Sequence, residues 1–218
     1  MNKDPKPTPE HFPKPLVALS SDALASLSRS TVSHYQRNAH DFREGTKDHD
    51  VSQNVDALLR HLPGESHQRI LDLGCGPGRD LMTFLECGHL PVGLDGAEAF
   101  VEMARTASGC EVWHQDFLAL ALPPERFDGV FANAVLFHVP TQELLRVLGD
   151  LHQTLVPGGV LFASNPRGPN IEQQHRLRYG AYLTFDKLKA GSLHVFAPGL
   201  EREVGTVAQA MLLLDVRA

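Results

Sequence analysis

Residues 70–80 read Ile-Leu-Asp-Leu-Gly-Cys-Gly-Pro-Gly-Arg-Asp, and the rest of the fold can be built outward from this stretch. Its first four residues predict a short buried strand, because Ile70, Leu71 and Leu73 are apolar. Glycines at 74, 76 and 78 follow without a spacer, and a helix is predicted over 79–87. A strand, a glycine-rich turn and a helix in this order let a ligand lie against bare backbone near the positive end of the helix.

Two acidic residues sharpen this interpretation, since glycines alone occur in many loops. Asp72 lies inside the predicted strand, and Asp95 ends a second apolar run, 21 positions after Gly74. A carboxylate at that place is a suitable acceptor for the hydroxyl pair of a ribose. The alternative for Asp95 is a helix N-cap ahead of a helix predicted over 97–107. The alternative for the turn is a purely structural role without a ligand.

Strands and helices alternate through the middle of the chain. Strands are predicted over 69–73, 90–95, 110–113, 127–133 and 159–164, and helices over 79–87, 97–107 and 141–155. Strands separated by helical segments indicate βαβ units, so the expected fold class is α/β, a doubly wound and mostly parallel sheet. The end of the chain is irregular and short for such a fold. A short helix over 184–190 and a closing hairpin of 193–197 with 210–216 are expected there.

The segment before the first strand is predicted to be helical. Residues 16–27 are ambiguous, residues 31–42 favour a helix, and apolar positions over 51–62 have helical spacing. We expect residues 1–15, which hold five prolines, to form a disordered leader. Residues 16–218 are then one domain, divided into a helical segment (16–66), a ligand-binding core (67–166) and a substrate-side and closing segment (167–218).

Composition narrows the class of protein. The 218 residues are 42% hydrophobic and 21% charged, as in one soluble globular domain. A formal net charge of −6 argues against a nucleic-acid partner, which usually meets a basic face. Three cysteines without metal-ligand spacing suit a reducing, cytoplasmic location. No apolar run approaches the ~20 residues of a membrane span, so no membrane partner is expected.

With these motifs placed, the chain resembles the class I S-adenosylmethionine-dependent methyltransferases. Residues 72–78, Asp-Leu-Gly-Cys-Gly-Pro-Gly, are similar to the first motif of that family, and Gln115-Asp116-Phe117 to its adenine-contacting motif. Residues 127–133 and 155–161 are similar to its fourth strand and to the entry of its fifth. The resemblance is strong over 69–166, weaker over 31–62 and poor past Gly180.

The resemblance implies a Rossmann-like fold, S-adenosylmethionine as cofactor, and methyl transfer to an O, N or S atom of a small molecule by in-line displacement. The glycines would lie under the methionine portion of the cofactor, with Asp72 close to the turn. Asp95 would bind the ribose and Asp116 the adenine amine, while Cys75 fills space. The implied cofactor-binding residues are Tyr35, Asp72, Gly74, Cys75, Gly76, Gly78, Asp95, Gly96, Asp116, Phe117 and Asn133.

Candidate residues for the methyl acceptor come from later segments. His138 follows the fourth strand and could deprotonate an acceptor, because imidazole titrates near neutral pH, or could merely position it. Arg167, Arg178 and Tyr179 follow the fifth strand, where substrate-facing loops are expected; the alternative is a solvated loop. A metal site at Asp48, His49 and Asp50 is the less favoured interpretation of that polar run, and no metal is predicted.

Two other functions remain open. An NAD(P)-dependent oxidoreductase normally carries Gly-x-Gly-x-x-Gly, whereas here the third glycine comes one residue earlier. A non-catalytic methyltransferase-like module is the second alternative, because the chain departs from the family pattern after Gly180. The sequence leaves the identity of the acceptor and the oligomeric state open.

Overall fold

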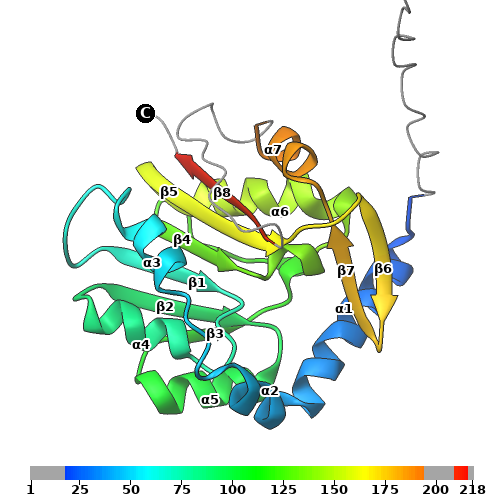
Figure 1. Cartoon of the computed structure of the whole chain (residues 1–218), viewed down its shortest axis with the longest axis horizontal. Helices are drawn as coiled ribbons and strands as arrows, with labels where there is room; N and C mark the ends of the chain where they lie inside the picture. The colour runs from blue at the N-terminus through cyan, green and yellow to red at the C-terminus, as the bar shows by residue number, and fades with distance from the viewer. Residues whose placement is uncertain (1–17, 194–208, 216–218) are drawn as a thin grey trace, which may run out of the picture.

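A central six-stranded sheet organises the computed structural model, which describes residues 18–193 and 209–215 (Figure 1). The strand order is β3-β2-β1-β4-β5-β8, with the first five strands parallel and β8 antiparallel to β5. The strands are β1 (Arg69–Leu73), β2 (Leu90–Asp95), β3 (Val112–His114), β4 (Phe127–Asn133), β5 (Leu155–Pro166) and β8 (Gln209–Asp215). The predicted doubly wound, mostly parallel α/β fold is therefore confirmed.

Helices cover both faces of this sheet. On one face lie α3 (Ser52–Leu59), α4 (Arg79–Glu86) and α5 (Glu98–Ser108), whose apolar side chains pack in two buried clusters with β1, β3, β4 and β5. On the other face lie α6 (Thr141–Thr154) and α7 (Phe185–Leu193), which pack in a third cluster. The helix and strand bounds predicted for the core agree with these to within a few residues.

The pleat of β1 distributes its side chains between the two cores. Ile70 packs with Leu58 and Phe84 on the face of α3 and α4, whereas Leu71 and Leu73 join the cluster of α6. Side chains two positions apart share a face, so Asp72 follows Ile70 onto the side of α3 and α4. A carboxyl group thus enters an otherwise apolar layer.

Segments from both ends of the chain meet beside the sheet. Helix α1 (Ser21–Arg37) leads into α2 (Ala39–Thr46), and a separate hairpin of β6 (Ile171–His175) and β7 (Arg178–Tyr182) lies against α1 (Figure 1). Ser30 Oγ donates to the Leu177 carbonyl at 2.8 Å, and the Tyr179 N–H donates to Thr31 Oγ1 at 3.0 Å. These bonds join residues almost 150 positions apart.

Three details differ from the sequence-based expectations. The segments 16–27 and 31–42 are not separate, because one helix runs from Ser21 to Arg37. No gap separates α6 from the next strand, predicted over 159–164, since β5 starts at Leu155 and its register against β4 shifts there. The hairpin β6–β7 replaces the expected loop, and its turn places Arg176 and Leu177 at φ of 47° and 73°.

The expected closing hairpin is only partly within the described residues. Residues 194–197 and the leader 1–15 lie outside them. The segment predicted over 210–216 forms β8, which pairs with β5. The short helix expected over 184–190 is α7.

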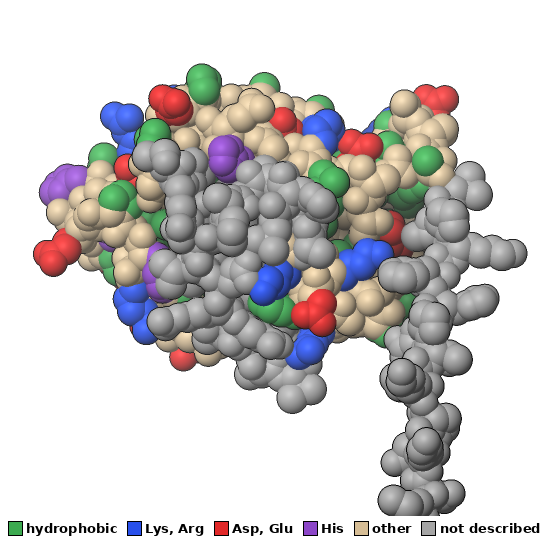
Figure 2. Space-filling model, turned by 90° about the horizontal axis from the view of Figure 1, so that it is seen from above, with side chains coloured by type: hydrophobic (Ala, Val, Ile, Leu, Met, Phe, Trp, Pro, Cys, Tyr) green, Lys and Arg blue, Asp and Glu red, His purple; other side chains and the backbone are tan. Residues whose placement is uncertain are grey.

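The surface of the described residues is mixed in charge on the face seen in Figure 2, where acidic and basic side chains alternate around the grey atoms. No helix within the described part of the chain is both long and apolar enough to cross a membrane.

Gly78 sets the packing of α4 against α5 and provides a test of the fold. Its φ is +91°, and a Cβ there would lie 2.8 Å from Ala104 Cα. Gly78→Ala should lower the free energy of unfolding by about 1–2 kcal/mol for the left-handed backbone and a further ~1–3 kcal/mol for overpacking, measured by urea unfolding. Gly88→Ala is the matched control, because Gly88 has φ +79° and nothing within 4 Å. Equal losses in the two variants would contradict the packing argument.

Candidate functional site

A pocket of about 560 Å³ opens at the carboxyl ends of the parallel strands, where ligands bind in open α/β sheets. It lies among β1, β2 and β4, with α1 and α2 on its outer side. Most of the predicted site residues line it: Tyr35, Gly74, Cys75, Gly76, Asp95, Gly96, Asp116, Phe117, Asn133 and His138. Asp72, Gly78, Arg167, Arg178 and Tyr179 are not among the described lining residues.

The glycine turn uses its own N–H groups to hold itself in place. The N–H groups of Gly74 and Cys75 both donate to the Leu94 carbonyl, at 2.7 and 3.1 Å. The Gly76 N–H donates to Asp95 Oδ2 at 3.0 Å, and the Gly78 N–H to the Cys75 carbonyl at 3.1 Å. Position 77 is proline and has no N–H. The turn is thus a preformed surface, and it has no spare donors of the kind that cradle a phosphate.

Gly76 leaves open space on the pocket side of this turn. A Cβ there would meet only Phe42 within 4 Å, at 3.8 Å, so it would project into the pocket. Gly74 differs, because a Cβ there would lie 2.4 Å from Val135 Cγ2. Cys75 is 7% exposed, and burial raises the pKa of its thiol well above the usual range. A neutral, buried thiol agrees with its interpretation as a filler.

Asp95 joins the turn to the start of α5. Besides accepting from Gly76, its carboxylate accepts from the Ala97 N–H at 2.8 Å. The N-cap residue of α5 is Ala97 and not Asp95. Asp95 therefore supports the start of the helix by accepting from Ala97, without being its N-cap. Burial raises the Asp95 pKa to about 6, against the N–H bonds that lower it. Each carboxylate oxygen has a second lone pair, and Asp95 lines the pocket, as binding of a diol requires.

Asp116 and Phe117 lie at a second wall, with support from α1. Asp116 Oδ1 accepts from the Leu118 N–H at 2.8 Å, and Oδ2 accepts from Ser28 Oγ at 2.6 Å. Asp116 is the N-cap of the short 3₁₀ helix Phe117–Ala119. Sequence reasoning missed Ser28, whose signal is weak because a serine on an exposed helix face is common.

Asp72 is buried on the α3–α4 face with an unsatisfied oxygen. It is 2% exposed, and its Oδ2 has no hydrogen-bond partner among the described residues. Burial raises the pKa of Asp72 well above the usual range, and the neighbouring Asp80 charge raises it further. Asp80 itself pairs with Arg79 at 2.7 Å, and Arg79 also donates to the Thr46 carbonyl. The acid therefore lacks a compensating donor of its own.

Asn133 ends β4 and belongs to a buried amide cluster. Its Oδ1 accepts from Ser164 Oγ at 2.7 Å and from Asn54 Nδ2 at 2.9 Å. Asn54 is 2% exposed, lines the pocket, and was not singled out from the sequence. The signal was present, because position 54 falls on the apolar face that Val51, Val55 and Leu58 define at helical spacing.

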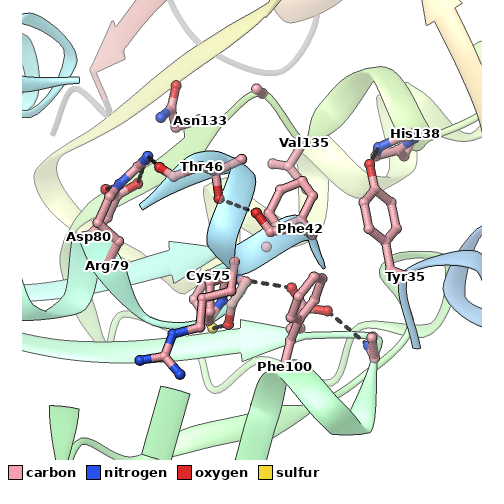
Figure 3. A pocket seen from close by; sticks show the side chains of 18 of the residues that line it. Tyr35, Phe42, Thr46, Cys75, Arg79, Asp80, Phe100, Asn133, Val135 and His138 are labelled. Atoms are coloured by element: carbon pink, nitrogen blue, oxygen red, sulfur yellow. Dashed lines mark hydrogen bonds and ion pairs between the residues drawn. The ribbon is translucent and has the colours of Figure 1, made fainter. Parts of the chain in front are cut away.

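Tyr35 and His138 point toward one another on the side of the pocket away from Asn133 (Figure 3). His138 Nδ1 lies 2.7 Å from the Tyr179 carbonyl, which can only accept, so Nδ1 carries the proton. Nε2 therefore accepts from the Tyr35 hydroxyl at 2.9 Å. Burial lowers the His138 pKa to about 4 despite the carbonyl bond, which raises it. His138 is neutral at pH 7, and catalysis by it stays a prediction.

Aromatic rings form the wall of the pocket next to Tyr35. Phe42 lies edge-on to Tyr35 with centroids 5.6 Å apart, and Phe100 is 5.3 Å from Phe42 (Figure 3). Sequence reasoning did not assign Phe42 or Phe100 to the site, because an aromatic residue on a helix face is usually core. Such rings suit a cationic or flat ligand.

None of the three residues expected to face the substrate is among the described residues that line the pocket. Arg178 places its guanidinium 5.8 Å from the centroid of the Tyr35 ring, and its Nη1 is 3.4 Å from the Tyr35 hydroxyl. Tyr179 is buried, and its hydroxyl donates to Glu172. Arg167 is exposed in the loop after β5. Their contact with a substrate stays a prediction.

The described residues include no group of three or more His, Cys, Asp or Glu side chains placed to hold a metal ion. His49 and Asp50 line the pocket rim, and Asp50 accepts from the Ser52 N–H at 2.9 Å.

Fold and pocket together define an open α/β protein with a ligand site at its topological switch point. Comparison with known proteins makes this specific: residues 70–159 match the family model described as "Methyltransferase domain". These residues are therefore similar to a methyltransferase domain, in agreement with the resemblance that the sequence motifs indicated.

Two curated relatives that match part of this chain are methyltransferases. The chain is 35% identical over 122 residues to trans-aconitate 2-methyltransferase of Azoarcus sp. (strain BH72), covering 55% of this chain and 47% of that protein. It is 28% identical over 154 residues to sterol 24-C-methyltransferase of Clavispora lusitaniae, covering 64% and 39%. The chain thus spans less than half the length of these two relatives.

One solved structure matches nearly the whole fold. The 1,6-didemethyltoxoflavin-N1-methyltransferase of Burkholderia thailandensis, with bound 1,6-didemethyltoxoflavin and S-adenosylhomocysteine, has a TM-score of 0.75 at 21% identity. The match covers 95% of this chain and 94% of that one. At this identity it supports the fold, which here extends beyond residues 70–159.

The state of His138 can be measured directly. In nitrogen-detected NMR between pH 6 and 8, His138 should show the neutral ring with its proton on Nδ1 and no titration, because burial lowers its pKa to about 4. His138→Asn supplies the assignment by difference, and exposed His40 serves as a histidine that samples solvent. A midpoint near 6.5 for His138 would contradict the buried, doubly bonded arrangement.

Proposed function

We propose that the protein is a methyltransferase that binds S-adenosylmethionine in this pocket and transfers its methyl group to a small molecule. The observation that carries the proposal is the glycine turn beside Asp95. The turn is locked by its own hydrogen bonds, Gly76 leaves a space that any side chain would fill, and a buried carboxylate stands next to it. This surface fits an adenosine whose sulfur-linked amino-acid chain, which carries no phosphate, lies across the turn.

The residues present fit the cofactor at each portion. Asp95 would accept from the ribose hydroxyls, and Asp116, held by Ser28, from the adenine amine. The orphan oxygen of Asp72 suits a donor from the amino-acid portion, directly or through water. Phe42 and Phe100 present aromatic rings, which suit the positive charge on sulfur. When bound, the cofactor supplies an already activated methyl group.

The contribution of the protein is then orientation and exclusion of water. An activated donor needs an acceptor atom held in line at about 3 Å, in a site closed to solvent. Tyr35, fixed between His138 and Arg178, closes one side of the pocket, and the α1 and α2 helices cover it from outside. With the His138 lone pair engaged by Tyr35, the arrangement favours positioning over general-base chemistry.

The rival functions have less support. An NAD(P) site normally has Gly-x-Gly-x-x-Gly at this turn, whereas here the third glycine comes one residue earlier, and the N–H groups of residues 74–78 pair within the protein. A non-catalytic module would not need the pocket of about 560 Å³, which holds lining residues beyond those assigned to the cofactor.

For the methyl acceptor we propose only its class, a small molecule. The two relatives and the similar solved structure are named for unlike acceptors, trans-aconitate, a sterol and 1,6-didemethyltoxoflavin. We keep an O, N or S acceptor, a cytoplasmic location and the absence of a nucleic-acid partner as predictions. The net charge of −6 supports the last of these.

Calorimetry with S-adenosylhomocysteine and NAD tests the cofactor. The protein should bind the former and not the latter, and Gly76→Ala should abolish binding, because its Cβ projects into the pocket. Gly88→Ala, with a similar backbone conformation and open surroundings, should bind normally. Methyl transfer is then sought with labelled S-adenosylmethionine over a panel of carboxylates, heteroaromatic amines and thiols. Binding of NAD alone, or unchanged affinity in Gly76→Ala, would reject the proposal.

Affinity should also depend on pH through Asp95. Its ligand-free pKa is about 6, and hydroxyl donors favour the ionised form. S-adenosylhomocysteine should therefore bind with constant affinity above pH 7 and lose up to about tenfold for each pH unit below 6. Asp95→Asn should bind more weakly at pH 7.5 and lose the dependence centred near 6. A wild-type affinity that rises on acidification would contradict this role.

A further inference from the structure

Asn54 lines the pocket and carries an unused acceptor that lies beneath the pocket surface. It is 2% exposed, and its Oδ1 has no hydrogen-bond partner among the described residues. The other end of the same amide is engaged, because Nδ2 donates to Asn133 Oδ1 at 2.9 Å. An amide that donates through nitrogen to one neighbour turns its oxygen away from it. Leaving a buried carbonyl without a donor is costly, so the position calls for a ligand with an N–H or O–H group.

The cluster around Asn54 fixes this orientation. Asn133 Oδ1 also accepts from Ser164 Oγ at 2.7 Å, so it is an acceptor for two donors and offers none to Asn54. Ser164 is fully buried and pairs with Asn133 across β5 and β4. The orientation of Asn54 is thereby set from β4 and β5, although the residue lies on α3.

A second orphan acceptor lies on the same face of the sheet. Asp72 Oδ2 is buried without a partner, and Asp72 pairs in register with Phe131, two residues before Asn133. Side chains of Asp72 and Asn133 therefore emerge on the face covered by α3 and α4, near the carboxyl ends of adjacent strands. Two unsatisfied acceptors, one of them acidic, suit a cation with several donors. A primary ammonium has three N–H groups and one positive charge.

We infer that Asn54 is a cofactor-binding residue whose side-chain oxygen accepts a hydrogen bond from the ammonium group of the amino-acid portion. The inference rests on the proposed function and extends it to α3, outside the matched residues 70–159. The placement agrees with the rest of the pocket. Asn133 lies on the side of the pocket away from Tyr35 and His138 (Figure 3), while in the proposed function Asp95 and Asp116 take the ribose and adenine.

Three ligands separate the ammonium from the rest of the cofactor. S-adenosylhomocysteine has ammonium and carboxylate, its decarboxylated analogue keeps only the ammonium, and 5′-methylthioadenosine has neither. Calorimetry with Asn54→Leu should show at least about tenfold weaker binding of the first two, relative to the third. Asn54→Asp should keep or increase the preference for both ammonium ligands, because it retains an acceptor oxygen and adds negative charge.

The pair of variants distinguishes direct contact from an effect through Asn133. Both variants remove the N–H that donates to Asn133. If Asn54 acted only through Asn133, both variants would therefore lower the preference for the ammonium ligands equally. Ser164→Ala, which removes the other donor to Asn133 Oδ1, would then have the same effect. Either result overturns the inference, as does a loss confined to S-adenosylhomocysteine, which would indicate recognition of the carboxylate.

Folding and the proposed function are checked in the same experiment. Binding of 5′-methylthioadenosine shows that a variant is folded. If Asn54→Leu does not bind it, Asn54→Asp alone tests the inference. Loss of the preference for ammonium ligands in Asn54→Asp then overturns the inference. If the wild-type protein binds none of the three ligands, the proposed function itself fails. If the wild type binds them and Asn54→Leu binds them unchanged, only the role of Asn54 fails.

Discussion

The site depends on the junction between the glycine turn and the end of β2. The Leu94 carbonyl accepts two N–H groups from the turn, and the Asp95 carboxylate accepts a third before reaching the start of α5. Parallel pairing of β1 with β2 brings these atoms together. Because the turn is held by the neighbouring strand, its surface is formed before any ligand arrives, and the same carboxylate that holds it faces the pocket.

A second unit closes the pocket from segments far apart in the chain. Tyr35 of α1, His138 after β4 and Arg178 of β7 are joined by hydrogen bonds, and Glu172 accepts from both Thr141 and Tyr179 behind them. The hairpin therefore acts on the pocket through its bonds to Thr31, Tyr35 and His138, and not by direct lining. A neutral imidazole serves this arrangement, because its one lone pair holds the Tyr35 hydroxyl.

Much of the fold followed from local pattern. The bounds of β1, β2 and β4 agree with prediction, because each is a buried apolar run that ends at a glycine, an acid or an amide. The hairpin β6–β7 was missed since its turn residues, Arg176 and Leu177, take positive φ without the Gly or Asn that normally indicates such a turn. Helix α1 was divided because its apolar face is broken by serines and is held by packing against β7.

The sequence by itself determined the resemblance to methyltransferases, the glycine turn and most of the predicted residues that line the pocket, since these lie in short motifs whose backbone chemistry is local. Only the tertiary structure decided what those residues can do. Burial and a carbonyl partner make His138 neutral, and the pairing of Asn54 with Asn133 leaves one amide oxygen free. Both outcomes depend on contacts between residues about 40 to 80 positions apart, which no spacing in a single segment encodes.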